Sequence, residues 1–297
     1  MRKLDETTIT SAVLDSLEST GDPRVKQVTT ALVQHLHDFA RAVSLTPEEW
    51  LAGIALLTQV GRKCTSTRQE FILLSDILGL STLVDAMHNR HQDAGTPSTV
   101  FGPFYREGVP LMELGARIMR DARHPVLVKG RIHDAHGDPV VGAEIEVWQA
   151  SPEGFYDIQL PDPTIIDLRG RFRTDASGEY RFVSEMPKGY PIPTDGPVGR
   201  ILHALGRHPN RPAHIHFLIH AAGFEELVTA LYLADDPYIG QDTVFGDSAP
   251  LAVLAGTPAQ EAPDMPCIQY DFGLVRTAEP RAGTVRVGAD PAALMAR

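Results

Sequence analysis

Two histidines separated by one residue, His214 and His216, form the pattern in this chain best suited to chemistry. Successive side chains of a β-strand point to opposite faces, so residues two apart share a face and both imidazoles can reach one metal ion. The flanking residues Ile215 and 217–219 are apolar, which predicts a largely buried strand. Because buried imidazoles need polar partners, the pair indicates either half of a metal site or two histidines on a polar face of a sheet.

Motifs of several other chemistries are missing from the sequence. His-Glu-x-x-His, Gly-x-Ser-x-Gly and Gly-x-Gly-x-x-Gly do not occur, and a chain with two cysteines has no Cys-rich zinc site. A cupin-type iron site needs a Glu shortly after the second histidine, where this chain has His220 and Ala221. The remaining candidate ligands are Tyr156 and Tyr190, whose neighbours predict loops. Each tyrosine by itself is more typical of a turn than of a metal site.

The elements that must position these side chains change in character near residue 95. Before it, apolar residues recur at helical spacing. The segments 22–23 and 46–49 read Asp-Pro and Thr-Pro-Glu-Glu, which are patterns that begin helices. Two shorter helices are expected at 71–78 and 81–91. Each helix has a broad apolar face, which must pack on another helix, on the next domain or on a second subunit.

After Gly95-Thr96-Pro97-Ser98, short apolar runs alternate with turns rich in Gly and Pro. Residues 143–148 alternate between apolar and polar as a half-buried strand does. Further strands are expected at 126–132, 178–182, 214–219, 227–233 and 268–274. Many short strands with turn signals predict a β-sandwich. The predicted fold class is therefore α+β, with an all-helical dimerisation and linker domain at residues 1–98 and an antiparallel β-sandwich catalytic domain at residues 99–297.

Composition excludes several kinds of partner. The chain has 297 residues, 22% of them charged, and a net charge of −11, which makes nucleic acid and anionic membrane surfaces poor partners. No apolar run approaches the ~20 residues that a membrane span needs, and residues 1–10 lack the apolar core of a secretory signal. With two cysteines and no sign of a disulfide framework, a cytoplasmic location is expected.

Together these features resemble the intradiol ring-cleaving dioxygenase family. The resemblance covers nearly the whole chain and is carried by the segments 71–76, 100–105, 142–150, 170–175, 190–199 and 211–217. The sequence Tyr-Pro-Ile-Pro-Thr-Asp-Gly-Pro-Val-Gly at 190–199 most resembles the hydroxyquinol 1,2-dioxygenase branch.

The resemblance implies one non-haem Fe(III) per subunit, held by Tyr156, Tyr190, His214 and His216. A ferric ion with two tyrosinates, two neutral histidines and one hydroxide has no net charge, which suits a buried site. The resemblance also implies two catalytic roles. Tyr190 is the ligand that the substrate displaces, and it then accepts a substrate proton. Arg211 stabilises negative charge that develops on the substrate ring.

The resemblance further implies a pocket for an aromatic diol or triol and O2. Its expected wall residues are Leu73, Asp76, Val100, Phe101, Gly102, Pro103, Phe104, Ile192, Pro193 and Val244. Most are apolar, which suits a flat ring. Asp76 is either a solvated or capping carboxylate, or it accepts a hydrogen bond from a third ring hydroxyl. The second role predicts cleavage of hydroxyquinol (1,2,4-trihydroxybenzene) between C1 and C2.

Several alternatives stay open. Catechol-cleaving relatives carry Gln where this chain has Ala230, but residues 111–124 and 246–250 match the family poorly, so chlorocatechol or catechol 1,2-dioxygenase activity is the alternative reaction. The turn at 137–139 is also typical of prealbumin-like β-sandwich modules, which bind ligands without catalysis. Finally, the resemblance implies a homodimer through the helical N-terminal region, with a phospholipid at the dimer axis as among relatives.

Overall fold

Three helices make up the first part of the chain: α1 (Ile9–Ser16), α2 (Pro23–Ala42) and α3 (Pro47–Lys63). The computed structural model describes residues 4–65, 67–89, 95–121, 123–162 and 164–277. Packing divides the chain into two units, Met1–Arg62 and Lys63–Arg297, which are described separately below. The domain boundary expected between residues 98 and 99 stays a prediction.

The two capping patterns of the sequence are confirmed in this first unit. The Asp22 carboxylate accepts hydrogen bonds from the backbone N–H groups of Arg24 and Val25, which begins α2 behind Pro23. Thr46 and Glu49 form a reciprocal capping box: each side chain accepts from the other's backbone N–H, at 3.2 and 3.0 Å. Local hydrogen bonds therefore fix where both helices begin.

The first unit leaves much apolar surface uncovered. Large apolar side chains along α2 and α3 are about half exposed, and they comprise Val25, Val28, Leu32, Leu36, Phe39, Val43, Trp50, Leu51, Ile54 and Leu57. A soluble monomer rarely exposes a large contiguous apolar patch. These two helices consequently present a surface that suits a partner.

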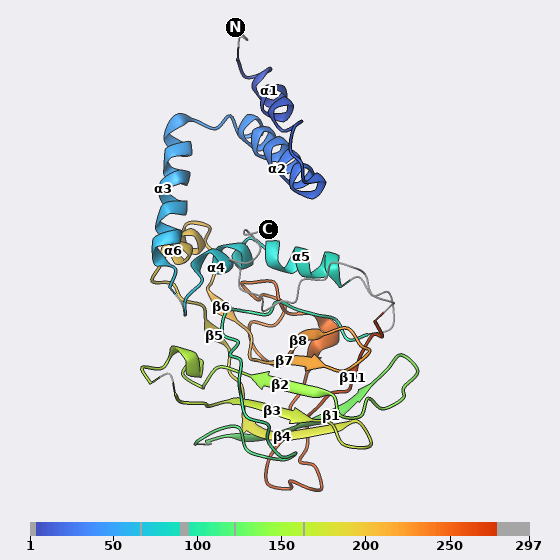
Figure 1. Ribbon diagram of the computed structural model, residues 1–297. Helices are drawn as coiled ribbons and strands as arrows, with labels where there is room; N and C mark the ends of the chain where they lie inside the picture. The colour runs from blue at the N-terminus through green and yellow to red at the C-terminus, as the bar shows by residue number, and fades with distance from the viewer. Residues whose placement is uncertain (1–3, 66, 90–94, 122, 163, 278–297) are drawn as a thin grey trace. The chain divides into compact units, whose positions relative to one another are not determined.

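The second unit begins with α4 (Glu70–Ile77) and α5 (Leu80–His88), and it also contains α6 (Pro197–Ala204) (Figure 1). Both expected short helices are present, although residues 90 and 91 of the second prediction lie outside the described residues. The buried carboxylate of Glu70 accepts from the N–H of Val198, which ties α4 to the beginning of α6. No single described helix is long and apolar enough to span a membrane; α4 and α5 meet that criterion only when counted together, across a 78° bend.

The remaining chain is rich in β-strands, and its sheets are mixed. The strands are β1 (Pro125–His133), β2 (Glu144–Trp148), β3 (Arg169–Arg173), β4 (Glu179–Glu185), β5 (Tyr190–Pro191), β6 (Asn210–Arg211), β7 (His214–His220), β8 (Leu227–Leu233), β9 (Ala252–Val253), β10 (Cys267–Gln269) and β11 (Phe272–Gly273). One sheet has the order β3-β2-β7-β8-β9, another has β10-β1-β11 with β4 also paired to β1, and β5 pairs with β6.

Three strand pairs depart from the purely antiparallel arrangement expected from the sequence. β1 runs parallel to β10 and β11, and β8 runs parallel to β9. Parallel neighbours need connections of about a dozen residues or more, and a long segment, 234–251, separates β8 from β9. The single strand expected over 268–274 is divided into β10 and β11. These edge strands are short, so period-two patterning cannot reveal their direction.

One hydrophobic cluster takes residues from both larger sheets. Val128 and Phe182 enter it from β1 and β4, while Ile215 and Phe217 enter it from β7. Because side chains alternate along a strand, the even-numbered residues at the start of β7 must point away from this core. The core therefore fixes the direction in which the two predicted histidine ligands point.

Candidate active site

The two histidines of the sequence pattern, His214 and His216, lie on β7 and are each 2% exposed. The Nδ1 atom of His214 donates to the carbonyl oxygen of Pro212 at 2.7 Å. The Nε2 atom of that ring therefore carries the lone pair, which faces the cluster. Burial lowers the pKa of both imidazoles well below the usual value, and the positive Arg211 acts in the same direction. Both rings are consequently neutral, which is the form that binds a cation.

The two tyrosines come from distant segments and meet at the first histidine. Tyr156 directly precedes the short helix η1 (Asp157–Gln159), and Tyr190 begins β5, where it lies opposite Arg211 of β6. The phenolic oxygens of the two tyrosines are 2.9 Å apart, and that of Tyr156 is 3.4 Å from His214 Nε2. Burial raises the pKa of both phenols. Neither phenol therefore ionises at neutral pH unless a nearby cation stabilises the phenolate.

His216 is held by packing rather than by hydrogen bonds. Its ring stacks on Trp148, with centroids 4.9 Å apart, because β2 and β7 place the two residues opposite each other. The ring of His214 lies edge-on at 4.7 Å. Among the described residues the buried Nδ1 of His216 has no hydrogen-bond partner. A buried polar atom in that state fits a site in which the ring coordinates a metal ion.

Phenolic oxygen is the distinctive donor of this cluster. Within the described ranges, no group of three or more His, Cys, Asp or Glu side chains is arranged to hold a metal ion. Any four-ligand site built on His214 and His216 must therefore recruit other donors. Among the described residues, phenol rings beside the histidines belong to Tyr156, Tyr190 and Tyr232. The hydroxyl of Tyr232 is already engaged by Arg211 and Thr99. Oxygen and imidazole ligands of this kind suit iron.

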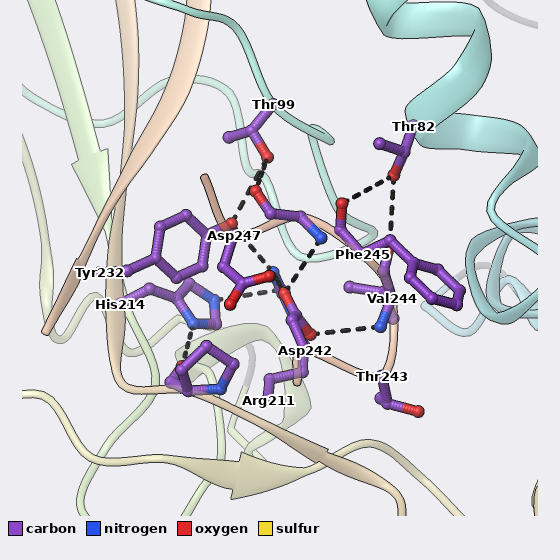
Figure 2. Close-up of polar contacts among 12 residues, drawn as sticks. Thr82, Thr99, Arg211, His214, Tyr232, Asp242, Thr243, Val244, Phe245 and Asp247 are labelled. Carbon is purple, nitrogen blue, oxygen red and sulfur yellow. Dashed lines mark hydrogen bonds and ion pairs between the residues drawn. The ribbon is translucent and has the colours of Figure 1, made fainter. Parts of the chain in front are cut away.

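Arg211 reaches the same cluster from β6 and is itself buried, with 5% of its surface exposed. Its Nη1 donates to His214 Nε2 at 3.1 Å, and its Nε and Nη2 donate to the carboxylate of Asp242 (Figure 2). Nη2 also donates to the hydroxyl of Tyr232 at 3.3 Å. Burial acts to lower the pKa of Arg211, but Asp242, Tyr190 and Tyr232 together outweigh it, and the pKa is raised well above the usual value. The cluster thus contains one permanent positive charge.

Comparisons with known proteins place this arrangement in a family. The "Dioxygenase" family model matches residues 100–277, and the "Catechol dioxygenase N terminus" model matches residues 22–96. The chain belongs to the intradiol ring-cleaving dioxygenase family.

The similar proteins align with this dioxygenase over most of its chain and most of their own. It is 47% identical to a 6-chlorohydroxyquinol 1,2-dioxygenase of Cupriavidus pinatubonensis, over 83% of this chain and 90% of the relative. A hydroxyquinol 1,2-dioxygenase of Rhizobium sp. is 48% identical over 79% of this chain and 80% of the relative. A crystal structure of hydroxyquinol 1,2-dioxygenase from Pseudomonas putida superposes with a TM-score of 0.87 at 44% identity, covering 92% of this chain and 99% of that one.

The pocket wall expected for this dioxygenase divides between two packed clusters. The first contains four of the expected residues, Leu73, Val100, Ile192 and Val244. The second surrounds the two tyrosines and contains two, Phe101 and Phe104. The structure thus brings the apolar residues together, although they come from several separate segments of the chain.

The other expected wall residues differ in their surroundings. Gly102 lies against His216, since a Cβ added there would be 3.7 Å from the Cε1 atom of that ring. Pro103 and Pro193 are half-buried. Asp76, in the last turn of α4, is only 5% exposed, so it is not a solvated carboxylate. Burial raises the pKa of Asp76, while a hydrogen bond from Ser81 and the charge of Arg211 oppose the rise.

A buried ion pair, which no sequence pattern indicated, supports Tyr156. The Nη2 atom of Arg169 lies 2.6 Å from the carboxylate of Asp157, and it also donates to the carbonyl oxygen of Phe104 at 2.8 Å. The ring of Phe104 in turn stacks on Tyr156 with centroids 4.5 Å apart. This dioxygenase therefore holds Tyr156 from two sides, through its neighbour in sequence and through the ring above it.

Proposed function

We propose that this dioxygenase inserts both atoms of O2 into hydroxyquinol and cleaves the ring between C1 and C2 to give 3-hydroxy-cis,cis-muconate, which is maleylacetate in its keto form. The observation that carries the proposal is the buried cluster of Tyr156, Tyr190 and His214 beside Arg211. The relatives named for hydroxyquinol and chlorohydroxyquinol support the choice of substrate.

We assign Fe(III) as the cofactor, one non-haem ion per subunit, with Tyr156, Tyr190, His214 and His216 as its ligands. The donor set fits the ion. Both phenols are buried and need a cation to ionise, both imidazoles are neutral, and the buried Nδ1 of His216 lacks a partner among the described residues. When bound, such an ion supplies Lewis acidity that draws electron density from the oxygens of the substrate.

The residues of the chain then have separate tasks. Tyr190, held as a phenolate by the ion, would accept a proton from a substrate hydroxyl, which gives the site a base without a carboxylate. The Nη1 atom of Arg211 faces the cluster and stabilises negative charge on the ring. Phe101 and Phe104 pack around the tyrosines and exclude water, which strengthens these electrostatic interactions.

The proposal is tested by loading the purified protein with ferric iron and recording its visible absorption before and after anaerobic addition of hydroxyquinol. We expect a tyrosinate-to-iron band that changes when the substrate binds, followed by uptake of one O2 per hydroxyquinol once air is admitted. A protein that stays colourless after loading would contradict the ligand set. A coloured protein that cleaves catechol or chlorocatechol faster would contradict the substrate instead.

Asp76 is proposed to select hydroxyquinol by accepting a hydrogen bond from the third ring hydroxyl. Hydrogen bonds to charged groups contribute about 1.5–3 kcal/mol, so Asp76→Ala is expected to lower the ratio of kcat/KM for hydroxyquinol over catechol by about 10- to 100-fold. Asp85→Asn is the matched control, because Asp85 lies on α5 and is held by Ser98 and Asn89. An unchanged ratio in Asp76→Ala would remove this role.

The assembly is also proposed to follow the family. We propose that the two larger sheets close as a β-sandwich, a proposal supported by their shared hydrophobic cluster. We propose a homodimer through residues 1–98, supported by the uncovered apolar faces of α2 and α3, with a phospholipid at its axis. Light scattering of the purified protein tests the homodimer, and lipid extraction tests the bound phospholipid.

A cytoplasmic location is proposed from the two cysteines, which form no disulfide.

A further inference from the structure

One buried carboxylate, that of Asp242, lies behind the guanidinium that faces the cluster. The Nε atom of Arg211 is 3.2 Å from Asp242 Oδ1, and its Nη2 is 3.1 Å from Oδ2 (Figure 2). The side chain of Asp242 is 0% exposed and that of Arg211 is 6% exposed. A guanidinium presents its donors in a rigid planar fork. With Nε and Nη2 held by the carboxylate, the direction of Nη1 toward His214 is determined.

The same carboxylate also organises the turn 242–247, which follows it in the chain. Oδ1 accepts from the N–H of Val244 and Oδ2 from the N–H of Gly246, both at 3.2 Å. Phe245 between them has a φ of 58°, a left-handed conformation that costs energy for a non-glycine residue. The turn therefore depends on the carboxylate inside it, and Figure 2 shows the Val244 amide directed at that carboxylate.

Neighbouring segments hold this turn from outside. Thr99 donates to the carbonyl oxygen of Gly246 at 2.8 Å, and Thr82 donates to that of Val244 at 3.2 Å. A Cβ added at Gly246 would lie 3.1 Å from Arg211 Nη2, so the turn and the guanidinium are in direct contact. Movement of the turn is therefore transmitted to Arg211.

We propose that Asp242 is a positioning residue, whose single carboxylate sets both the direction of the Arg211 guanidinium and the place of Val244 in the pocket wall. The inference rests on the proposed function for the roles of Arg211 and Val244. The arrangement itself requires only the contacts within this chain. One side chain thereby links the stabilisation of ring charge to the fit of the substrate.

The test compares Asp242→Asn with Asp247→Asn, a matched change in the same turn. The Asp247 carboxylate accepts from the N–H of Gly240 and has no hydrogen bond to Arg211. In Asp242→Asn, the amide NH2 group faces a donor of Arg211 in either orientation, together with the N–H of Val244 or of Gly246. A displacement of about 1 Å costs about 100-fold in rate. We therefore expect Asp242→Asn to lower kcat/KM for hydroxyquinol about 100-fold, through a lower kcat and a higher KM. The kcat/KM of Asp247→Asn should stay near that of the wild type.

Hydrogen exchange of backbone amides in the metal-free proteins supplies a second measurement. The Val244 and Gly246 amides are expected to exchange faster in Asp242→Asn and at the wild-type rate in Asp247→Asn. Arg211→Lys is the further variant, and it serves if Asp242→Asn does not fold. Lysine lacks the planar fork of donors, so the Val244 and Gly246 amides should also exchange faster in Arg211→Lys. When Arg211→Lys is already present, adding Asp242→Asn should lower kcat/KM much less than it does in the wild-type protein.

The outcomes separate this inference from the proposed function. Wild-type exchange at Val244 and Gly246 in both Asp242→Asn and Arg211→Lys would overturn the positioning role, even in an enzyme that cleaves hydroxyquinol. Additive effects of the two substitutions on kcat/KM would overturn it as well. If the wild-type protein does not cleave hydroxyquinol, the proposed function fails, while faster exchange in the variants still supports the role of Asp242.

Discussion

Tyr190→Phe is expected to lower kcat for hydroxyquinol by about 1,000-fold and to weaken the visible band of the ferric protein. The substitution removes a proposed ligand and the proposed proton acceptor, and general base catalysis contributes about 100- to 10,000-fold. It also leaves the hydroxyl of Tyr156 without its partner at 2.9 Å. Single-turnover kinetics and absorption of the iron-loaded variant measure the two effects separately.

Tyr232→Phe is the matched control for this change. Tyr232 is also fully buried and near the cluster, but its hydroxyl contacts Arg211 and Thr99 and it is not a proposed ligand. Tyr232→Phe should therefore keep the band of the wild-type protein. A Tyr190→Phe protein with the spectrum and kcat of the wild type would refute the role assigned to Tyr190.

The largest effect on stability is expected from Arg169→Met, which leaves the buried carboxylate of Asp157 with only the more distant Arg106, at 4.0 Å, as a counter-charge. The side chains of this pair are 2% and 0% exposed. Removing one partner of a buried ion pair typically costs about 3–5 kcal/mol. The substitution also removes the donor to the carbonyl oxygen of Phe104. We expect a loss of this size in the free energy of unfolding, measured by urea denaturation of the metal-free protein.

The matched control removes an arginine from an exposed pair. The side chain of Arg173 is 56% exposed and pairs with Glu144, which Arg171 also contacts. Surface pairs contribute about 0–1 kcal/mol, so Arg173→Gln should change the free energy of unfolding by no more than this. Equal losses in Arg169→Met and Arg173→Gln would mean that burial of the Asp157 pair has no special importance.

Local patterns in the sequence predicted the parts of the fold that depend on local physics. The capping residues Asp22 and Thr46 mark the beginnings of α2 and α3 because their bonds reach only two or three residues along the chain. The histidine pair predicted its own strand because alternation along a strand has a strict period of two. Confirmation of the family added the wider context that short motifs alone do not supply.

The buried ion pairs missed by the sequence analysis join distant segments of the chain, and their unpredicted members are Asp242, Asp157 and Arg169. Arg211 and Asp242 are 31 positions apart, and Arg169 and Asp157 are 12 apart. No period or spacing signals such a pair, because each charge taken alone looks like a surface residue. The edge strand β9 was not predicted at all, for a similar reason, since two residues carry no pattern. Burial of a charge becomes visible only in the folded chain.

The stacking of Trp148 on His216 gives the protein a built-in optical reporter. The chain has two tryptophans, Trp50 and Trp148, and their surroundings are opposite. Trp148 is 1% exposed and its ring lies 4.9 Å from the imidazole, whereas Trp50 is 56% exposed on α3. The fluorescence of Trp148 is therefore expected to respond when a ligand binds beside His216. The fluorescence of Trp50 is expected to respond when a partner packs on α3. Intrinsic emission thus distinguishes ligation from association without a label.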